Sequence, residues 1–130
     1  MNEQAILCVD DESIILLSLS QELKNSFGDR FIYETALNAE NALSIIDALA
    51  EEGVKIILII SDWLMPGMKG DEFLEKVYEG HPDTKVIMIT GHADTQALMR
   101  VEKIPSVKGI LEKPWNPEKL KRLIEEICPV

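Results

Sequence analysis

The sequence predicts an α/β fold in which helices cover both faces of one parallel sheet. Five short apolar runs alternate along the chain with five segments whose apolar residues have helical spacing. The run at residues 56–60 is apolar at every position, as expected for a strand whose sheet is buried on both faces. We therefore expect an open, doubly wound sheet of five strands and five helices.

Each strand prediction rests on one of the apolar runs. These runs are residues 5–9, 31–36, 55–60, 85–89 and 107–111. Runs this short that are separated by longer, periodic segments are typical of strands in a parallel sheet.

The helix predictions rest on apolar residues three or four positions apart. In chain order these residues are Leu16, Leu19, Leu23 and Phe27; Leu43, Ile46 and Leu49; Phe73, Leu74, Val77 and Tyr78; Leu98 and Val101; and Leu120, Leu123, Ile124 and Ile127. Asn38 is placed to cap the second helix, and Asn116 followed by Pro117 to begin the fifth. The fourth helix has a thin apolar stripe, and Pro105 would end it before Ser106.

Size and composition indicate one ordinary globular domain, residues 1–130. The chain is 46% hydrophobic and 28% charged, which is typical of a folded protein. Cys8 lies within an apolar run and Cys128 near the other end of the sequence, so we expect both to be reduced and structural.

Charge and hydropathy argue against two classes of partner. A formal net charge of −10 disfavours binding to a phosphate backbone, which requires clustered lysine and arginine. The longest uninterrupted apolar run, residues 56–60, is far too short to span a bilayer, and residues 1–4 do not begin a signal peptide. We expect no direct binding of nucleic acid, no membrane partner and a cytoplasmic location.

Polar residues follow four of the five predicted strands, where ligands bind in sheets of this kind. Asp10 and Asp11 follow the first strand, Asp62 the third, Thr90 the fourth and Lys113 the fifth. Each residue alone is more often a turn or cap residue, but their coincidence at four strand ends is hard to explain in that way. A sheet order of 2-1-3-4-5 would place these four ends side by side.

This set of side chains is suited to phosphoryl transfer. Two carboxylates about 4 Å apart repel by roughly 4 kcal/mol at an effective dielectric of about 20. A raised carboxyl pKa, the ammonium of Lys113 or a bound metal must therefore offset the repulsion among Asp10, Asp11 and Asp62. Oxygen ligands favour Mg²⁺. Asp62, expected on an exposed loop that turns at Pro66 and Gly67, would be the nucleophile and become an aspartyl phosphate. Mg²⁺ and Lys113 would neutralise the transferring group, and the Thr90 hydroxyl would donate to it.

These residues resemble the receiver domain of two-component response regulators. The matching segments are LCVDDE at residues 7–12, SDWLMPGMKG at 61–70, IMITG at 87–91 and LEKPW at 111–115. The resemblance implies a flavodoxin-like fold with sheet order 2-1-3-4-5.

The resemblance also implies residue roles. Asp62 would accept phosphate from a histidine of a sensor kinase or a phosphotransfer protein. Asp11 and Asp62 would ligate Mg²⁺ together with the backbone carbonyl of Leu64, and Asp10 would act through a coordinated water. Thr90 would be the switch hydroxyl.

The resemblance implies further roles for residues in and just after the fifth predicted strand. Lys113 would bind the phosphoryl group, and the Lys113–Pro114 bond would be cis, as it often is in relatives. Ile110 stands where many relatives carry a tyrosine or phenylalanine that turns inward with the switch hydroxyl. Two interpretations remain open: Ile110 repacks as Thr90 shifts, or it is a strand residue packed under the last helix.

As a member of this family, the chain would catalyse only its own phosphorylation and dephosphorylation. Its state would be read on the face of the fourth helix, fifth strand and fifth helix by an effector domain or a downstream protein, and a second copy of the chain is a further candidate partner. Leu64 and His92 flank the site in relatives, and His92 either orients a water or lies in solvent.

Three other classes of protein fit the sequence less well. A phosphatase with an aspartyl nucleophile needs an aspartate two residues after Asp62, where Leu64 stands. A flavin carrier needs a phosphate loop after the first strand, where residues 10–12 are acidic. A pseudo-receiver that binds partners without phosphorylation is the remaining alternative, although it would not need the full set of polar residues.

Overall fold

A five-stranded parallel sheet forms the centre of the molecule. The computed structural model describes residues 3–62, 67, 70–91, 99 and 102–128. The strands are β1 (Gln4–Val9), β2 (Ile32–Ala36), β3 (Lys55–Asp62), β4 (Lys85–Thr90) and β5 (Val107–Glu112). Their order in the sheet is β2-β1-β3-β4-β5, and all neighbouring pairs are parallel, which confirms the predicted topology.

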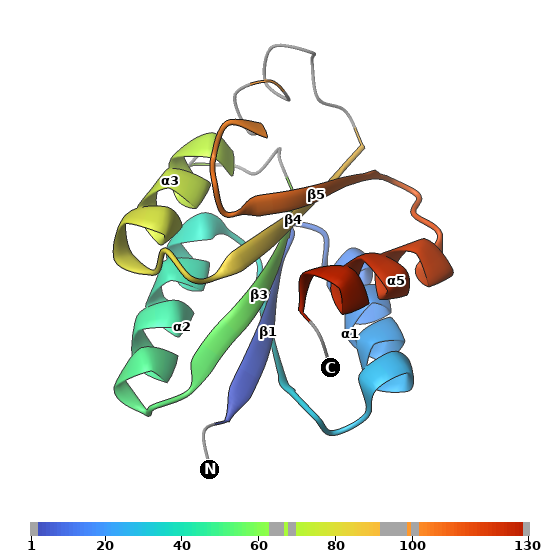
Figure 1. Ribbon diagram of the computed structural model, residues 1–130, viewed down its shortest axis with the longest axis horizontal. Coiled ribbons are helices and arrows are strands. Elements are labelled where there is room, and N and C mark those ends of the chain that lie inside the picture. The colour runs from blue at the N-terminus through green and yellow to red at the C-terminus, as the bar shows by residue number, and fades with distance from the viewer. Residues whose placement is uncertain (1–2, 63–66, 68–69, 92–98, 100–101, 129–130) are drawn as a thin grey trace.

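Helices cover both faces of this sheet. The described helices are α1 (Ser13–Phe27), α2 (Ala39–Glu51), α3 (Gly70–Gly80) and α5 (Pro117–Ile127). Figure 1 shows α1 and α5 on one face and α2 and α3 on the other. The described part of the chain thus holds four helices, and the helix expected around Leu98 and Val101 falls largely outside it. No helix in the described ranges combines the length and apolar character needed to cross a bilayer.

Each face of the sheet has its own core, because successive strand residues point in opposite directions. Ile6 and Cys8 of β1 pack toward α1 and α5, whereas Leu7 and Val9 pack toward α2 and α3. The apolar stripe of α1 is buried throughout, as its spacing predicts. Tyr78, expected on the buried stripe of α3, is exposed instead.

Asparagine caps begin two of the helices, as predicted. Oδ1 of Asn38 accepts the backbone N–H of Asn41 at 2.8 Å. Oδ1 of Asn116 accepts the N–H groups of Glu118 and Lys119 at 2.9 and 3.3 Å. These bonds satisfy amides that have no partner within their helix. Four residues separate the end of β5 from the start of α5.

A glycine in β5 lets α5 lie close to the sheet. A Cβ atom on Gly109 would come within 2.7 Å of Cδ2 of Leu123. The absence of a side chain at this position therefore determines how closely the two elements approach.

Candidate functional site

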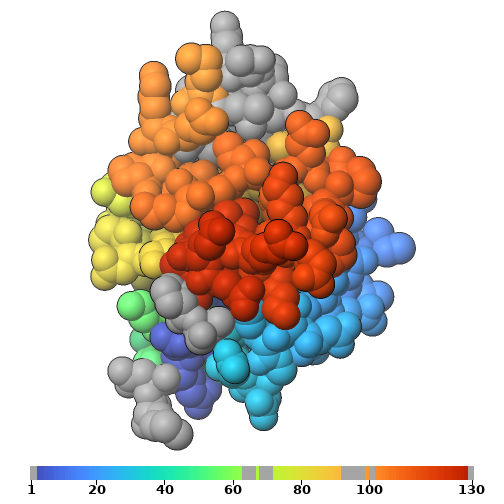
Figure 2. All heavy atoms as spheres, turned by 45° about the vertical axis from the view of Figure 1, so that its right-hand side comes forward, coloured from blue at the N-terminus to red at the C-terminus, as the bar shows by residue number. Residues whose placement is uncertain are grey.

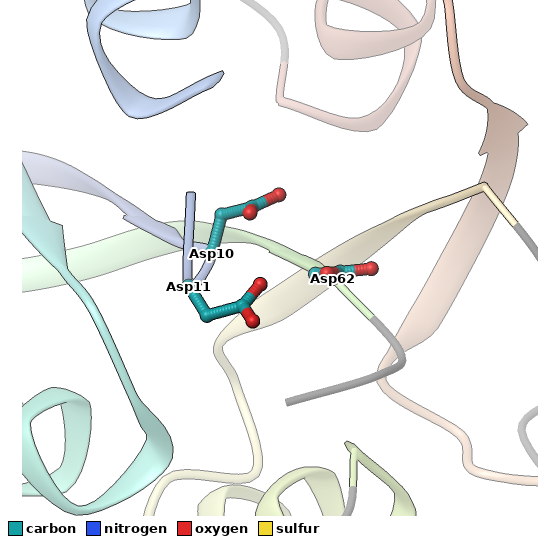
Figure 3. Close-up of side chains that lie close together, drawn as sticks. All are labelled: Asp10, Asp11 and Asp62. Carbon is teal, nitrogen blue, oxygen red and sulfur yellow. The ribbon is translucent and has the colours of Figure 1, made fainter. Parts of the chain in front are cut away.

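Three carboxylates converge at the carboxyl end of the sheet. Asp10 and Asp11 directly follow β1, and Asp62 is the last residue of the neighbouring strand β3. One carboxylate oxygen from each residue lies within 4.8 Å of the other two (Figure 3). The sequence prediction that these side chains share one site is thus supported by their positions.

The burial of Asp62 differs from the sequence expectation. Asp62 is 7% exposed and belongs to β3, so the prediction that it lies exposed on a loop is wrong. The strand continues for two residues beyond its apolar run because Ser61 and Asp62 pair with Met88 and Ile89 of β4. Strand pairing therefore fixes the backbone of the expected nucleophile.

The side chain of Lys113, the residue directly after β5, reaches the carboxylates. Its Nζ atom lies 2.7 Å from Oδ2 of Asp10 and 3.4 Å from Oδ2 of Asp62. The Lys113 side chain is 17% exposed. Burial alone would lower the pKa of Lys113, but the hydrogen bond to Asp10 and the charges of Asp62 and Asp10 outweigh it, so this pKa is raised. The ammonium is therefore a permanent counter-ion of the cluster at neutral pH.

Asp10 is held on both oxygens. Oδ1 accepts the backbone N–H of Glu12 at 2.9 Å, and Oδ2 accepts from Lys113. Asp10 is 2% exposed, whereas Asp11 is exposed. Asp11 is consequently better placed than Asp10 to offer an oxygen directly to a metal.

Thr90 lies at the same edge of the sheet. It is the last residue of β4 and is buried, and its backbone carbonyl accepts the N–H of Lys113 at 2.9 Å. Thr90 and Lys113 therefore occupy the ends of adjacent strands, as predicted. The Lys113–Pro114 peptide bond is cis, as the resemblance implied.

Several predictions concern residues outside the described ranges. The proposed metal ligand Leu64 and the flanking residue His92 are both among them. Gly67 is described, and its φ of 86° agrees with the expected turn.

Ile110 faces the core beneath α2 and α3. The interpretation that places it under the last helix is therefore wrong. The physical reason is the alternation of side chains along β5, because Gly109 and Leu111 take the face toward α5.

One contact at this edge was not predicted from the sequence. The indole N–H of Trp115 donates to Oε1 of Glu22 at 2.8 Å, linking the segment after Lys113 to α1. The two residues are 93 positions apart, and neither lies in a pattern that would signal the contact. The contact depends on how α1 and α5 pack together.

The donor set suits a hard divalent ion. Mg²⁺ binds oxygens at about 2.1 Å, so two of its ligands lie at most about 4 Å apart. One oxygen of each carboxylate lies within 4.8 Å of the other two. To share one ion, these oxygens need only move slightly closer or bind it through a bridging water. Asp10, Asp11 and Asp62 could therefore hold Mg²⁺.

Comparison with known proteins identifies the family. Residues 6–125 match the response regulator receiver domain, so the chain belongs to this family. It is 30% identical over 125 residues to a chemotaxis protein CheY homolog of Campylobacter jejuni, covering 94% of this chain and 90% of that protein. A CheY-like receiver domain from Methanospirillum hungatei has a similar structure, with a TM-score of 0.82, 31% identity and coverage of 97% and 93% of the two chains. The flavodoxin-like fold and the receiver assignment are thereby confirmed.

Other relatives are much longer than this chain. The sensor kinase CckA of Brucella abortus is 29% identical over 122 residues, but the chain spans only 12% of its length. The hydrogenase transcriptional regulatory protein HoxA of Cupriavidus necator is 30% identical, and the chain spans 23% of it. Receiver domains of this kind thus occur in proteins with different outputs.

Proposed function

We propose that this receiver domain is a phospho-accepting signalling switch whose acceptor is Asp62. The donor would be a phosphohistidine of a sensor kinase or a phosphotransfer protein. A P–O bond to the Asp62 carboxylate forms as the P–N bond breaks, and the imidazole nitrogen keeps the electron pair. The domain would catalyse only its own phosphorylation and dephosphorylation, in the cytoplasm, where ATP supplies the kinase.

The observation that carries this proposal is the position of Lys113 over the carboxylates. An ammonium 3.4 Å from Oδ2 of Asp62 is placed to neutralise oxygens of a group arriving at that carboxylate. Because β3 and β4 hold the backbone of Asp62, the nucleophile does not have to be ordered during the reaction.

The remaining residues have supporting roles in this proposal. Mg²⁺, held by Asp11, Asp62 and the carbonyl of Leu64, with Asp10 acting through a water, would neutralise charge on the transferring group. The Thr90 hydroxyl would donate to a phosphoryl oxygen. Movement of Thr90 toward the phosphoryl group would then alter the face made by a fourth helix, β5 and α5. An effector domain, a downstream protein or a second copy of the chain would bind this face.

The test is covalent modification by a small donor. With Mg²⁺ and acetyl phosphate, intact-mass analysis should show one phosphoryl adduct on the wild-type protein, and Asp62→Asn should show none. Asp83→Asn is the matched control and should react as the wild type does, because Asp83 precedes the amino end of β4, away from the site. An unmodified wild-type protein, or an equal adduct on Asp62→Asn, would remove the proposal. A pseudo-receiver would behave in the first of these ways.

A further inference from the structure

The connection between β5 and α5 is tied to α1 by one hydrogen bond with a charged acceptor. The Nε1 atom of Trp115 lies 2.8 Å from Oε1 of Glu22, and both side chains are half-buried. Figure 2 shows α5 beside α1 on this face of the molecule. A bond to a charged acceptor at this distance is among the stronger kinds of hydrogen bond.

The same connection carries Lys113. At its start, the backbone N–H of Lys113 donates to the carbonyl of Thr90 at 2.9 Å. At its end, Asn116 caps α5. Trp115 lies between these two anchors, and its bond to Glu22 adds a third, on an element outside the strand and helix that the connection joins.

The position of Trp115 must influence that of Lys113. Residues two apart are separated by at most about 7 Å, so a shift of the indole is passed along a short chain. The Lys113 ammonium makes close contacts of 2.7 and 3.4 Å with two carboxylates, and contacts of this kind weaken with small displacements. The Trp115 ring also packs against the core beneath α1 and α5, but packing is less directional than a hydrogen bond.

We propose that Glu22 is a positioning residue for Lys113, because its carboxylate holds the Trp115 indole and thereby sets where the ammonium meets Asp10 and Asp62. The consequence for phosphoryl transfer rests on the proposed function. The simpler alternative is that the bond only fastens α1 to α5 and contributes to stability.

Three single variants, the double variant Glu22→Ala/Trp115→Phe and one control separate a positioning role from a purely stabilising one. Glu22→Ala removes the acceptor, Trp115→Phe removes the donor but keeps a packed ring, and Glu22→Gln keeps a side-chain carbonyl that can still accept. Glu125→Ala removes one negative charge from an exposed position of α5 and serves as the control.

The first measurement is independent of metal and phosphate. Hydrogen exchange of the Lys113 backbone amide should be about three- to tenfold faster in Glu22→Ala and Trp115→Phe than in the wild type. Glu22→Gln and Glu125→Ala should remain close to the wild type. If exchange at Lys113 is unchanged in both deletion variants, the proposal fails, whatever the wild-type protein does with phosphate.

The second measurement follows acyl phosphate formation from acetyl phosphate and Mg²⁺ at several donor concentrations. Glu22→Ala and Trp115→Phe should each reduce kcat/KM about three- to tenfold, and the double variant should lose no more than either single variant. Glu22→Gln should retain most of the wild-type rate of acyl phosphate formation. A lower Tm with unchanged kinetics would mean that the bond only fastens the helices, whereas a wild-type protein that forms no acyl phosphate would count against the proposed function alone.

Discussion

The Nζ atom of Lys113 lies 2.7 Å from Oδ2 of Asp10, although the two residues are 103 positions apart. Asp10 follows β1 and Lys113 follows β5, and β3 and β4 lie between these strands. The long lysine side chain therefore reaches across two strands to place its ammonium among the carboxylates. Any divalent ion at Asp10, Asp11 and Asp62 must share these oxygens with a cation that the fold already supplies.

Lys113→Met should consequently bind Mg²⁺ more tightly than the wild-type protein. Removing a competing charge from a partly screened site should lower the Mg²⁺ Kd about three- to tenfold. The same variant should form acyl phosphate at least about tenfold more slowly, because the transferring group loses a counter-ion. Calorimetric titration with Mg²⁺ and intact-mass kinetics measure the two effects. Lys119→Met is the control, and equal Mg²⁺ affinity in wild type and Lys113→Met would contradict the competition.

Mg²⁺ should stabilise the folded protein by relieving repulsion among the carboxylates. At ten times Kd the stabilisation is about 1.4 kcal/mol, which corresponds to a rise in Tm of roughly 3 to 6 °C. Asp11→Asn should reduce the shift. Thermal unfolding with and without millimolar Mg²⁺ measures it, and an unchanged Tm in the wild type would argue that the cluster is not a metal site.

The buried thiol of Cys8 should make stability depend on pH in the alkaline range. Burial, with a smaller contribution from the charge of Asp10, raises the pKa of Cys8 from 9.0 to about 12. Above pH 9 the unfolded chain loses this proton while the folded chain keeps it, so the free energy of unfolding falls as pH rises. The expected loss is roughly 1 kcal/mol between about pH 9 and pH 10.

Cys8→Ala should remove that part of the pH dependence while lowering stability at neutral pH. The pKa of Cys128 is also raised, chiefly by burial, so Cys128→Ala is needed to separate the two thiols. Urea unfolding in metal-free buffer at several pH values provides the data. The same slope in wild type and Cys8→Ala would show that this thiol does not titrate differently in the two states.

Gly109→Ala should destabilise the contact between β5 and α5. The added Cβ would lie 2.7 Å from Cδ2 of Leu123, so the leucine must change its rotamer or α5 must move. Overpacking of this kind costs about 1 to 3 kcal/mol. In a double-mutant cycle measured by urea unfolding, Leu123→Ala should absorb much of the cost of Gly109→Ala. Strictly additive losses would place the strain elsewhere.

Lys85→Met should loosen the carboxyl end of α5. The ammonium of Lys85 donates to the backbone carbonyl of Ile127 at 2.7 Å, and a cation is favourable where a helix leaves carbonyls unpaired. We expect a loss of about 1 kcal/mol, with faster hydrogen exchange confined to the last turn of α5. Lys55→Met, an exposed change on the neighbouring strand, is the control, and equal exchange in the two variants would assign the helix end to packing alone.

The apolar runs in the sequence were sufficient to predict the strands and the polar residues that meet at their carboxyl ends. The apolar runs reveal the strands because burial on both faces of a parallel sheet leaves a local pattern. Parallel strands all end at the same edge, so Asp10, Asp62, Thr90 and Lys113 could be assigned to one site without coordinates. The resemblance to receiver domains added the order of the sheet and the cis bond at Pro114.

The local sequence pattern predicted less well where strand pairing or the packing of β5 decides the structure. The polar residues Ser61 and Asp62 looked like the start of a loop, yet strand β4 holds them in the sheet. The sequence could not assign Ile110 to one face of the sheet. With glycine at position 109, β5 has no clear alternation of apolar and polar residues.

The residue types and their spacing along the chain determined which groups meet at the carboxyl edge, since strand direction and side-chain alternation are short-range properties. Tertiary structure alone decided that the Lys113 ammonium contacts Asp10 and Asp62, that the Asp62 carboxylate is buried, and that Trp115 bonds to Glu22. These relationships depend on the distance between packed elements and on the reach of side chains across it. No periodicity in the sequence encodes either quantity for residues 93 or 103 positions apart.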